Sequence, residues 1–295
     1  MNQKMVSQLH ELIEQRNGQY VNDVREESLV EDFIKKKINM NKERGAEIVR
    51  SFVEGDVIRT SRVDDHLYVD YLQRCEFLIH LKDQLYLEEL VEQRRATFVQ
   101  DELREDQVIA SREVEQEAIE TTANVRSFQH DQRTNRSYNR REAVRYAERW
   151  WDDFNPQYRK FTDNCTNFIS QCLHAGGATM KGYPNRSNGW WFRSNNWSYS
   201  WSVAHALRWY LSGENGGLRG VEKESAMELE PGDVICYDFN GDGRWQHTTI
   251  VVDKDANGEP LVNAQTANSR MRYWKYEDST AWTPNIKYKF FHITI

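Results

Sequence analysis

The chain has 295 residues, a formal net charge of −7 and 39% apolar residues. This length is enough for two domains of ordinary size. The part from Glu142 onward holds 17 basic and 18 acidic residues, so neither half has the basic excess of a nucleic-acid-binding surface. No run of 18 apolar residues is present, so no transmembrane segment is expected.

Composition divides the chain near its middle. All ten tryptophans lie at or after Trp150, and 12 of the 15 glycines lie from Gly176 onward. We therefore predict an N-terminal domain over residues 1–120 and a C-terminal domain over 139–295. Between them, the polar stretch 121–138 has the composition of an exposed linker.

The first domain shows two apolar periods. Spacings of three and four residues predict helices over 5–13, 29–38 and 48–53. Alternating apolar residues then predict strands, at 67–71, 75–81 and 85–87. We favour an antiparallel sheet packed on helices. The alternative is a long charged helical hairpin, which the absence of proline favours.

The start of the chain and the cysteines bear on the cellular compartment. Residues 1–14 form an amphipathic pattern without the apolar centre of a secretory signal, so a cytoplasmic location is the default expectation. A chain from which a signal has been removed stays an alternative. Four cysteines are too few for a disulfide scaffold, and no Cys/His spacing indicates zinc.

A cysteine opens one helix of the second domain. After a helix over 143–151, a second helix is predicted from an N-cap at Thr162 or Asp163 to the Gly176-Gly177 pair. Cys165 then lies in the first turn, where free N–H groups and the helix dipole favour a thiolate and could bind an oxyanion. The alternative for Cys165 is a buried structural cysteine.

A histidine opens a later strand. Residues 234–237 and 248–252 read as a hairpin around a polar turn, and His247 begins its second strand. Among the eight histidines, only His247 stands between a tight hairpin and an apolar strand in the domain that carries Cys165. A structural role is common for such a residue. We nevertheless expect the Cys165 sulfur within hydrogen-bond reach of a His247 ring nitrogen.

Two polar residues on the next strand could orient that histidine. Asn263 and Gln265 lie two apart on the predicted strand 261–265, so they share a face.

Trp190 and Trp191 lie in a loop region that could line a substrate cleft, with the hydrophobic core as the alternative. The segment from Asp238 resembles the start of a calcium loop, but its twelfth position is Thr249 rather than glutamate. No metal or cofactor is predicted.

The second domain resembles a known family. The run from Asp163 to Gly177, with Tyr146 to Trp151 upstream and Leu229 to Asp233 downstream, is similar to the bacterial "putative amidase domain" family. That family resembles the NlpC-type and CHAP cell-wall hydrolases, which share a papain-like α+β fold. The resemblance covers about 139–295 and implies a helix packed on an antiparallel sheet.

The resemblance also implies roles for individual residues. It implies Cys165 as the nucleophile, His247 as the general base and a polar orienting residue on the following strand. Alignment to the NlpC-type strand selects Asn263, which we prefer; alignment to a His-Thr pair common in the amidase family selects Gln265. The chain departs from the amidase-family pair at Gln265, where that pair has histidine. It also departs directly before the cysteine, where the family often has aspartate and this chain has Asn164.

The expected function is cysteine-dependent amide-bond hydrolysis through a thioester, with peptidoglycan or its peptide fragments as the substrate that the family implies. The alternative is a catalytically idle papain-like domain that serves as a binding or assembly module. The family would place the chain at the cell wall or spore, in tension with the cytoplasmic default. No similar family is recognised for residues 1–138, and the sequence indicates no protein partner for residues 1–120.

Overall fold

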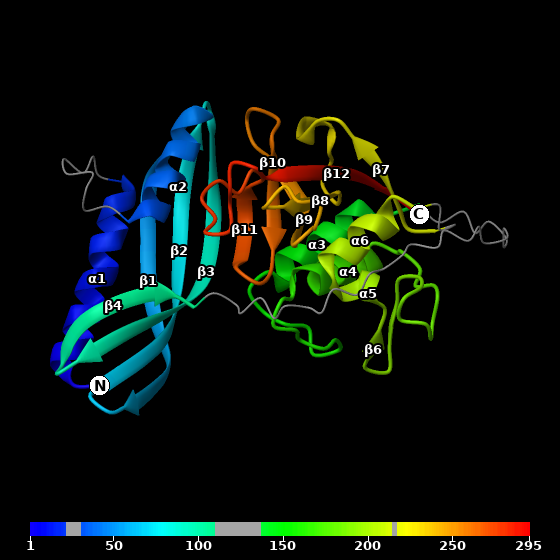
Figure 1. Cartoon of the computed structure of the whole chain (residues 1–295). Helices are drawn as coiled ribbons and strands as arrows, with labels where there is room; N and C mark the ends of the chain where they lie inside the picture. Colours follow the sequence, from blue (N-terminus) through cyan, green and yellow to red (C-terminus); the bar gives the residue numbers. More distant parts are fainter. Residues whose placement is uncertain (22–30, 110–136, 214–216) are drawn as a thin grey trace. The chain divides into compact units, whose positions relative to one another are not determined.

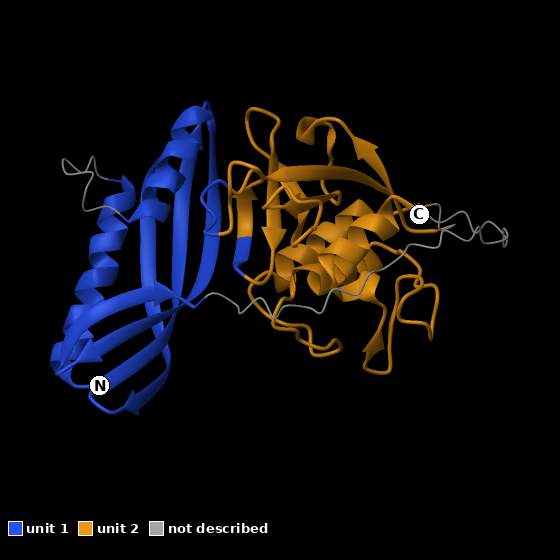
Figure 2. Cartoon of the chain, in the orientation of Figure 1, with its two compact units in different colours: residues 1–111, 267–269, 277–280 blue, residues 112–266, 270–276, 281–295 orange. Residues whose placement is uncertain are grey.

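The computed structural model describes residues 1–21, 31–109, 137–213 and 217–295. The chain divides into two compact units (Figure 2), and both are α+β with antiparallel strand pairing. Unit 1 comprises residues 1–111 with two short later segments, 267–269 and 277–280; unit 2 comprises the rest. In unit 1, the Asp278 carboxylate accepts a hydrogen bond from Lys37 Nζ at 3.2 Å. The predicted linker over 121–138 lies outside the described residues, except for its last two.

Unit 1 is an antiparallel sheet with two helices packed against it (Figure 1), as favoured from the sequence. The sheet has the order β1-β2-β3, and β4 pairs with β3. Its elements are α1 (Gln3–Val21), α2 (Asp32–Glu43), β1 (Ala46–Val63), β2 (His66–Leu81), β3 (Gln84–Val99) and β4 (Glu102–Val108). Helix α1 can approach β1 closely because residue 55 is glycine: a Cβ there would meet Ile13 Cδ1 at 2.5 Å.

The helix predicted over 48–53 is wrong, because these residues belong to β1. A shift of register between Ile48 and Arg50 interrupts the regular pairing with β2. Such an irregularity changes which side chains face the core, so Ile48 and Val53 are both buried although they lie five residues apart. Val49 and Phe52, which complete the apparent helical spacing, are exposed residues of the strand.

Unit 2 has a sheet with the order β11-β10-β9-β8-β12-β7, and helices α3, α4 and α6 lie on one face of it (Figure 1). The helices are α3 (Arg140–Trp150), α4 (Cys165–Ala175), α5 (Tyr199–Ser202) and α6 (Ala204–Leu211). The sheet strands are β7 (Arg219–Lys223), β8 (Val234–Asp238), β9 (His247–Lys254), β10 (Pro260–Ala264), β11 (Asn268–Tyr273) and β12 (Lys287–Thr294). Of β11, only residues 270–273 belong to unit 2. Strands β5 (Phe192–Arg193) and β6 (Asn196–Trp197) form a separate pair. Among the helices of the described ranges, none is long and apolar enough to cross a membrane.

Helix α4 is central to the unit 2 core. Every residue from Cys165 to Leu173 is buried. Its apolar side chains pack with alternate residues of β8 and β9, namely Val234, Cys236, Ile250 and Val252. Since side chains alternate along a strand, these positions define the face of the sheet that meets the helices.

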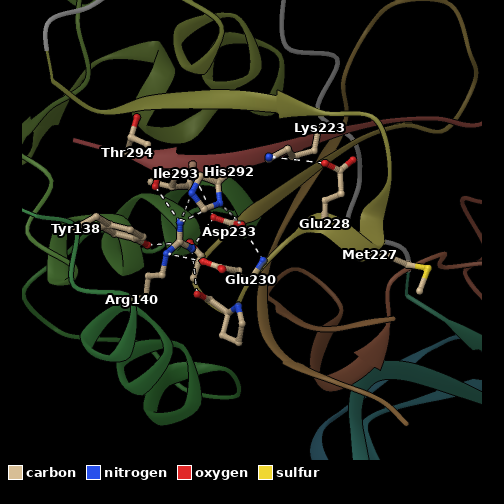
Figure 3. A network of polar contacts seen from close by, with 12 residues as sticks. Tyr138, Arg140, Lys223, Met227, Glu228, Glu230, Asp233, His292, Ile293 and Thr294 are labelled. Atoms are coloured by element: carbon tan, nitrogen blue, oxygen red, sulfur yellow. Dashed lines mark hydrogen bonds and ion pairs between the residues drawn. The ribbon is translucent and has the colours of Figure 1, made fainter. Parts of the chain in front are cut away.

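A buried carboxylate joins the start of α3 to β12 (Figure 3). Asp233 is fully buried and accepts hydrogen bonds from Arg140 Nη1 at 2.6 Å and from the Ile293 N–H at 2.8 Å. The Glu230 N–H donates to it at 2.8 Å, and His292 Nδ1 lies 3.1 Å away. The network fixes the end of the turn that leads into β8.

Candidate functional site

Cys165 is the first residue of α4, as predicted, and is 4% exposed. Its N-cap is Asn164, not Thr162 or Asp163. The sulfur lies 3.6 Å from the Thr166 hydroxyl, which in turn lies 3.2 Å from the Thr248 hydroxyl on β9. Burial raises the pKa of the Cys165 thiol above its ordinary value, and hydrogen bonds from Thr166 and Thr248 offset part of that rise. The expected thiolate is therefore a thiol at neutral pH in this arrangement.

His247 lies on the opposite face of the sheet from Cys165, so the expected contact between them is absent from the structure. In the ladder, Tyr237 pairs with His247, and Cys236 pairs with Thr248. Cys236 and Thr248 face α4, so the side chains of their neighbours point away from it. The His247 ring instead lies near Tyr276 and Phe239, at centroid distances of 5.3 and 6.1 Å.

The surroundings of His247 keep its ring neutral. It is 9% exposed, and Nε2 is buried without a hydrogen-bond partner among the residues described. Burial, with a smaller contribution from the Arg272 charge, lowers its pKa to about 3. A ring that stays neutral and faces away from the sulfur does not have the position of a base for Cys165.

The buried His247 predicts a loss of stability in mild acid. Its folded-state pKa is lower than its unfolded value, so the unfolded chain binds a proton first as the pH falls below about 6.5. We expect the free energy of unfolding to fall by about 2 kcal/mol between pH 7 and pH 5 from this group. Urea unfolding at the two pH values measures the loss, and His247→Phe should reduce it. The matched control is His80→Phe, which changes an exposed histidine.

Neither predicted orienting residue contacts His247. Asn263 donates from Nδ2 to Glu148 at 2.8 Å and accepts from the Met271 N–H at 2.9 Å. Gln265 donates from Nε2 to the backbone oxygen of Asp153 at 2.8 Å. Asn263 is therefore part of the connection between α3 and β11, whereas Gln265 lies beside the start of α4.

The two positions at which the chain departs from the family pattern are in contact. Asn164 Nδ2 donates a hydrogen bond to Gln265 Oε1. Asn164 Oδ1 accepts from the Phe161 N–H and from Asn167 Nδ2, both at 2.9 Å. Where the resemblance implies an aspartate and a histidine, a neutral pair of amides stands next to Cys165. Amide side chains do not transfer protons as a carboxylate and an imidazole do.

Thr266 is a site residue that we did not single out from the sequence. Its Oγ1 accepts hydrogen bonds from the Asn164 N–H at 3.0 Å and from the Cys165 N–H at 3.2 Å. Its backbone φ is 94°, which is an unusual conformation for a β-branched residue. The signal available in the sequence was the alignment of Gln265-Thr266 with the His-Thr pair.

The tryptophans proposed for substrate binding are buried. Trp190 and Trp191 are 0% and 1% exposed. Trp190 Nε1 donates to Ser170 Oγ at 2.9 Å, and Trp191 Nε1 donates to the Asn185 carbonyl at 3.1 Å. Both are core residues with their polar atoms satisfied, so the structure corrects their assignment to a cleft.

Two other features of unit 2 lie away from Cys165. The Asp238 carboxylate accepts from the N–H groups of Gly241 at 2.8 Å and Gly243 at 2.7 Å, which explains the calcium-like sequence as a turn. A cavity of about 600 Å³ lies at the first turn of α3 and is lined by residues 139–142, 144, 145 and 231.

The comparisons agree with the resemblance at the level of the family. The family model described as "Putative amidase domain" matches residues 137–291, which is more than half of the chain. The chain belongs to this family. No solved structure matches it.

Two relatives from Bacillus subtilis (strain 168) are similar to the chain. It is 47% identical to "Uncharacterized protein YhbB" over 303 aligned residues, which cover 97% of this chain and 94% of that protein. It is 28% identical to "Uncharacterized protein YjcM" over 142 residues, which cover 45% of this chain and 32% of that protein. The putative amidase domain suggests hydrolase activity, and the YhbB match extends over unit 1 as well.

Proposed function

We propose that unit 2 is a thiol-dependent amide hydrolase in which Cys165 is the nucleophile. The observation that carries the proposal is the place of Cys165 at the first position of α4 in a domain of the amidase family. The thiolate attacks an amide carbonyl, the amine leaves with a proton from water, and a second water hydrolyses the thioester to regenerate the thiol. The resemblance to NlpC-type and CHAP enzymes supports peptidoglycan peptide fragments as the substrate class.

In this proposal, His247 does not remove the thiol proton. Since His247 faces the other side of the sheet and Gln265 is an amide, hydroxide generates the thiolate. Hydrogen bonds from Thr166 and Thr248 then stabilise the negative sulfur. A raised thiol pKa makes the enzyme slow at neutral pH and faster in alkali.

The pH profile of alkylation and hydrolysis tests this mechanism. Below the thiol pKa, the thiolate fraction rises about tenfold per pH unit, so iodoacetamide labelling of Cys165 should rise in that proportion from pH 7 to 9. Cleavage of soluble peptidoglycan fragments, followed by mass spectrometry, should rise in parallel. Cys165→Ala should abolish cleavage, whereas the control Cys172→Ala changes a core cysteine and should retain it. A profile that reaches a plateau below pH 7 would contradict the mechanism.

The second candidate is an idle domain that binds a peptide without cleaving it. The neutral contact between Asn164 and Gln265 favours it, because the aspartate and the histidine of the family at these two positions are missing together. Fragment binding measured by calorimetry, with equal affinity in wild type and Cys165→Ala and no cleavage at any pH, would establish this candidate in place of the first.

A further inference from the structure

We propose that the Thr266 hydroxyl occupies the oxyanion position of the Cys165 site and acts as an internal competitor of the substrate. The proposal rests on the thiol hydrolase function above. Thr266 is not a catalytic residue in this proposal, since its oxygen bonds to the backbone of the nucleophile and not to the reacting atoms.

The donors that Thr266 engages are those that would receive a negative oxygen. In attack by a cysteine at a helix start, charge develops on the carbonyl oxygen beside the N–H groups of the first turn. Here the N–H of Cys165 itself donates to Thr266 Oγ1 at 3.2 Å, and the preceding N–H donates at 3.0 Å. A single hydroxyl oxygen from a residue about a hundred positions later thus accepts both.

The N-cap residue of α4, Asn164, does not take this role itself. The Asn164 side chain makes no cap bond to α4, because its oxygen accepts from Phe161 and Asn167 and its nitrogen donates to Gln265. Thr266, which lies in the turn after β10, therefore acts as the cap of α4. An oxyanion can bond to the Cys165 N–H once the hydroxyl has moved away.

The backbone conformation of Thr266 and the contacts of its neighbour hold the hydroxyl in one position. Its φ of 94° is in the region where L-residues are rare, and threonine carries a branched Cβ. The flanking Gln265 is held through bonds from both ends of its amide, to Asn164 and to the Asp153 backbone oxygen. The hydroxyl is therefore directed at the α4 start by a turn that surrounding contacts hold in this conformation.

Two alkylating probes of different charge test the proposal in the full chain. Thr266→Val removes the hydroxyl and keeps the side-chain shape, so both N–H groups become available to an anion. Iodoacetate carries a carboxylate and iodoacetamide carries a neutral amide of similar size. We expect the ratio of Cys165 labelling rates, iodoacetate over iodoacetamide, to rise roughly tenfold in Thr266→Val, which is the scale of a helix terminus acting on a partly buried anion.

Thr266→Ser supplies the matched control, since it retains the hydroxyl and should keep the wild-type ratio. General loosening of the site would accelerate both probes equally and leave the ratio unchanged, which would overturn the proposal. If Thr266→Val fails to fold, Thr266→Ala is used in its place, and the same ratio of labelling rates is measured. Labelling of Cys165 requires no turnover. Absence of hydrolysis would therefore count against the proposed function but would not affect the ratio of labelling rates.

Discussion

Replacing Asn164 with aspartate and Gln265 with histidine in one variant is expected to raise the reactivity of Cys165 at pH 7. The two wild-type side chains are hydrogen-bonded to each other beside the nucleophile, so their replacements would form a carboxylate–imidazole pair there. A positioned base contributes typically about 10²- to 10⁴-fold to such a reaction. We expect an increase of about 10²-fold in iodoacetamide labelling of Cys165 and in cleavage of peptidoglycan fragments at this pH.

The single variants and one triple variant control this experiment. Asn164→Asp alone adds a negative charge next to the sulfur and should slow labelling, because a nearby carboxylate disfavours the thiolate. Gln265→His alone should give a smaller gain than the double variant. Adding Cys165→Ala to the double variant should remove both signals. A correctly folded double variant that is no faster than wild type would show that position 265 does not reach the sulfur.

Asp233→Ala is expected to cause the largest loss of stability. The variant removes a fully buried carboxylate and leaves the Ile293 N–H, the Glu230 N–H and part of the Arg140 guanidinium without an acceptor (Figure 3). Removal of one partner from a buried ion pair costs about 3–5 kcal/mol. Because Arg140 is 23% exposed and water can replace part of the lost interaction, we expect about 3 kcal/mol.

Thermal unfolding followed by circular dichroism measures this effect. A loss of about 3 kcal/mol corresponds to a fall in Tm of roughly 6–12 °C for a unit of this size. Asp253→Ala is the control, since Asp253 lies on the same sheet with an exposed side chain and should change Tm little. Equal shifts in the two variants would mean that the Asp233 network does not hold the sheet to α3.

Local signals in the sequence predicted the elements around the site correctly. The helix that starts at Cys165 and the hairpin that carries His247 lie where turn and apolar patterns placed them, although the predicted N-cap at Thr162 or Asp163 was wrong. The error concerned the face of the strand. Ile250 and Val252 are core-facing positions, and His247 differs from them by an odd number of residues, so the alternation of the strand directs it away from the helix. The predicted contact between Cys165 and His247 followed from the order of the motifs in the resemblance and did not take this spacing into account.

Other parts of the site depend on contacts that no local pattern records. Asn164 and Gln265 are about a hundred residues apart, and only the packed sheet brings their amides together. The cap of α4 likewise comes from Thr266, whereas capping patterns describe only residues near the helix start. In unit 1, the exposed apolar residues Val49 and Phe52 of β1 completed a false helical period. The sheet there was predictable because apolar residues alternate along β2, where Cys75, Phe77, Ile79 and Leu81 are all buried.

The position of β12 determines when unit 2 can finish folding. This strand pairs with β8 along one edge and with β7 along the other, although it follows both in the chain. On the ribosome, β7 and β8 are therefore synthesised more than 45 residues before the segment that joins them. Until residues 287–294 emerge, both strands have unpaired backbone edges that can pair with another chain. Nascent chains that stall before this segment are thus expected to associate with one another through these two edges.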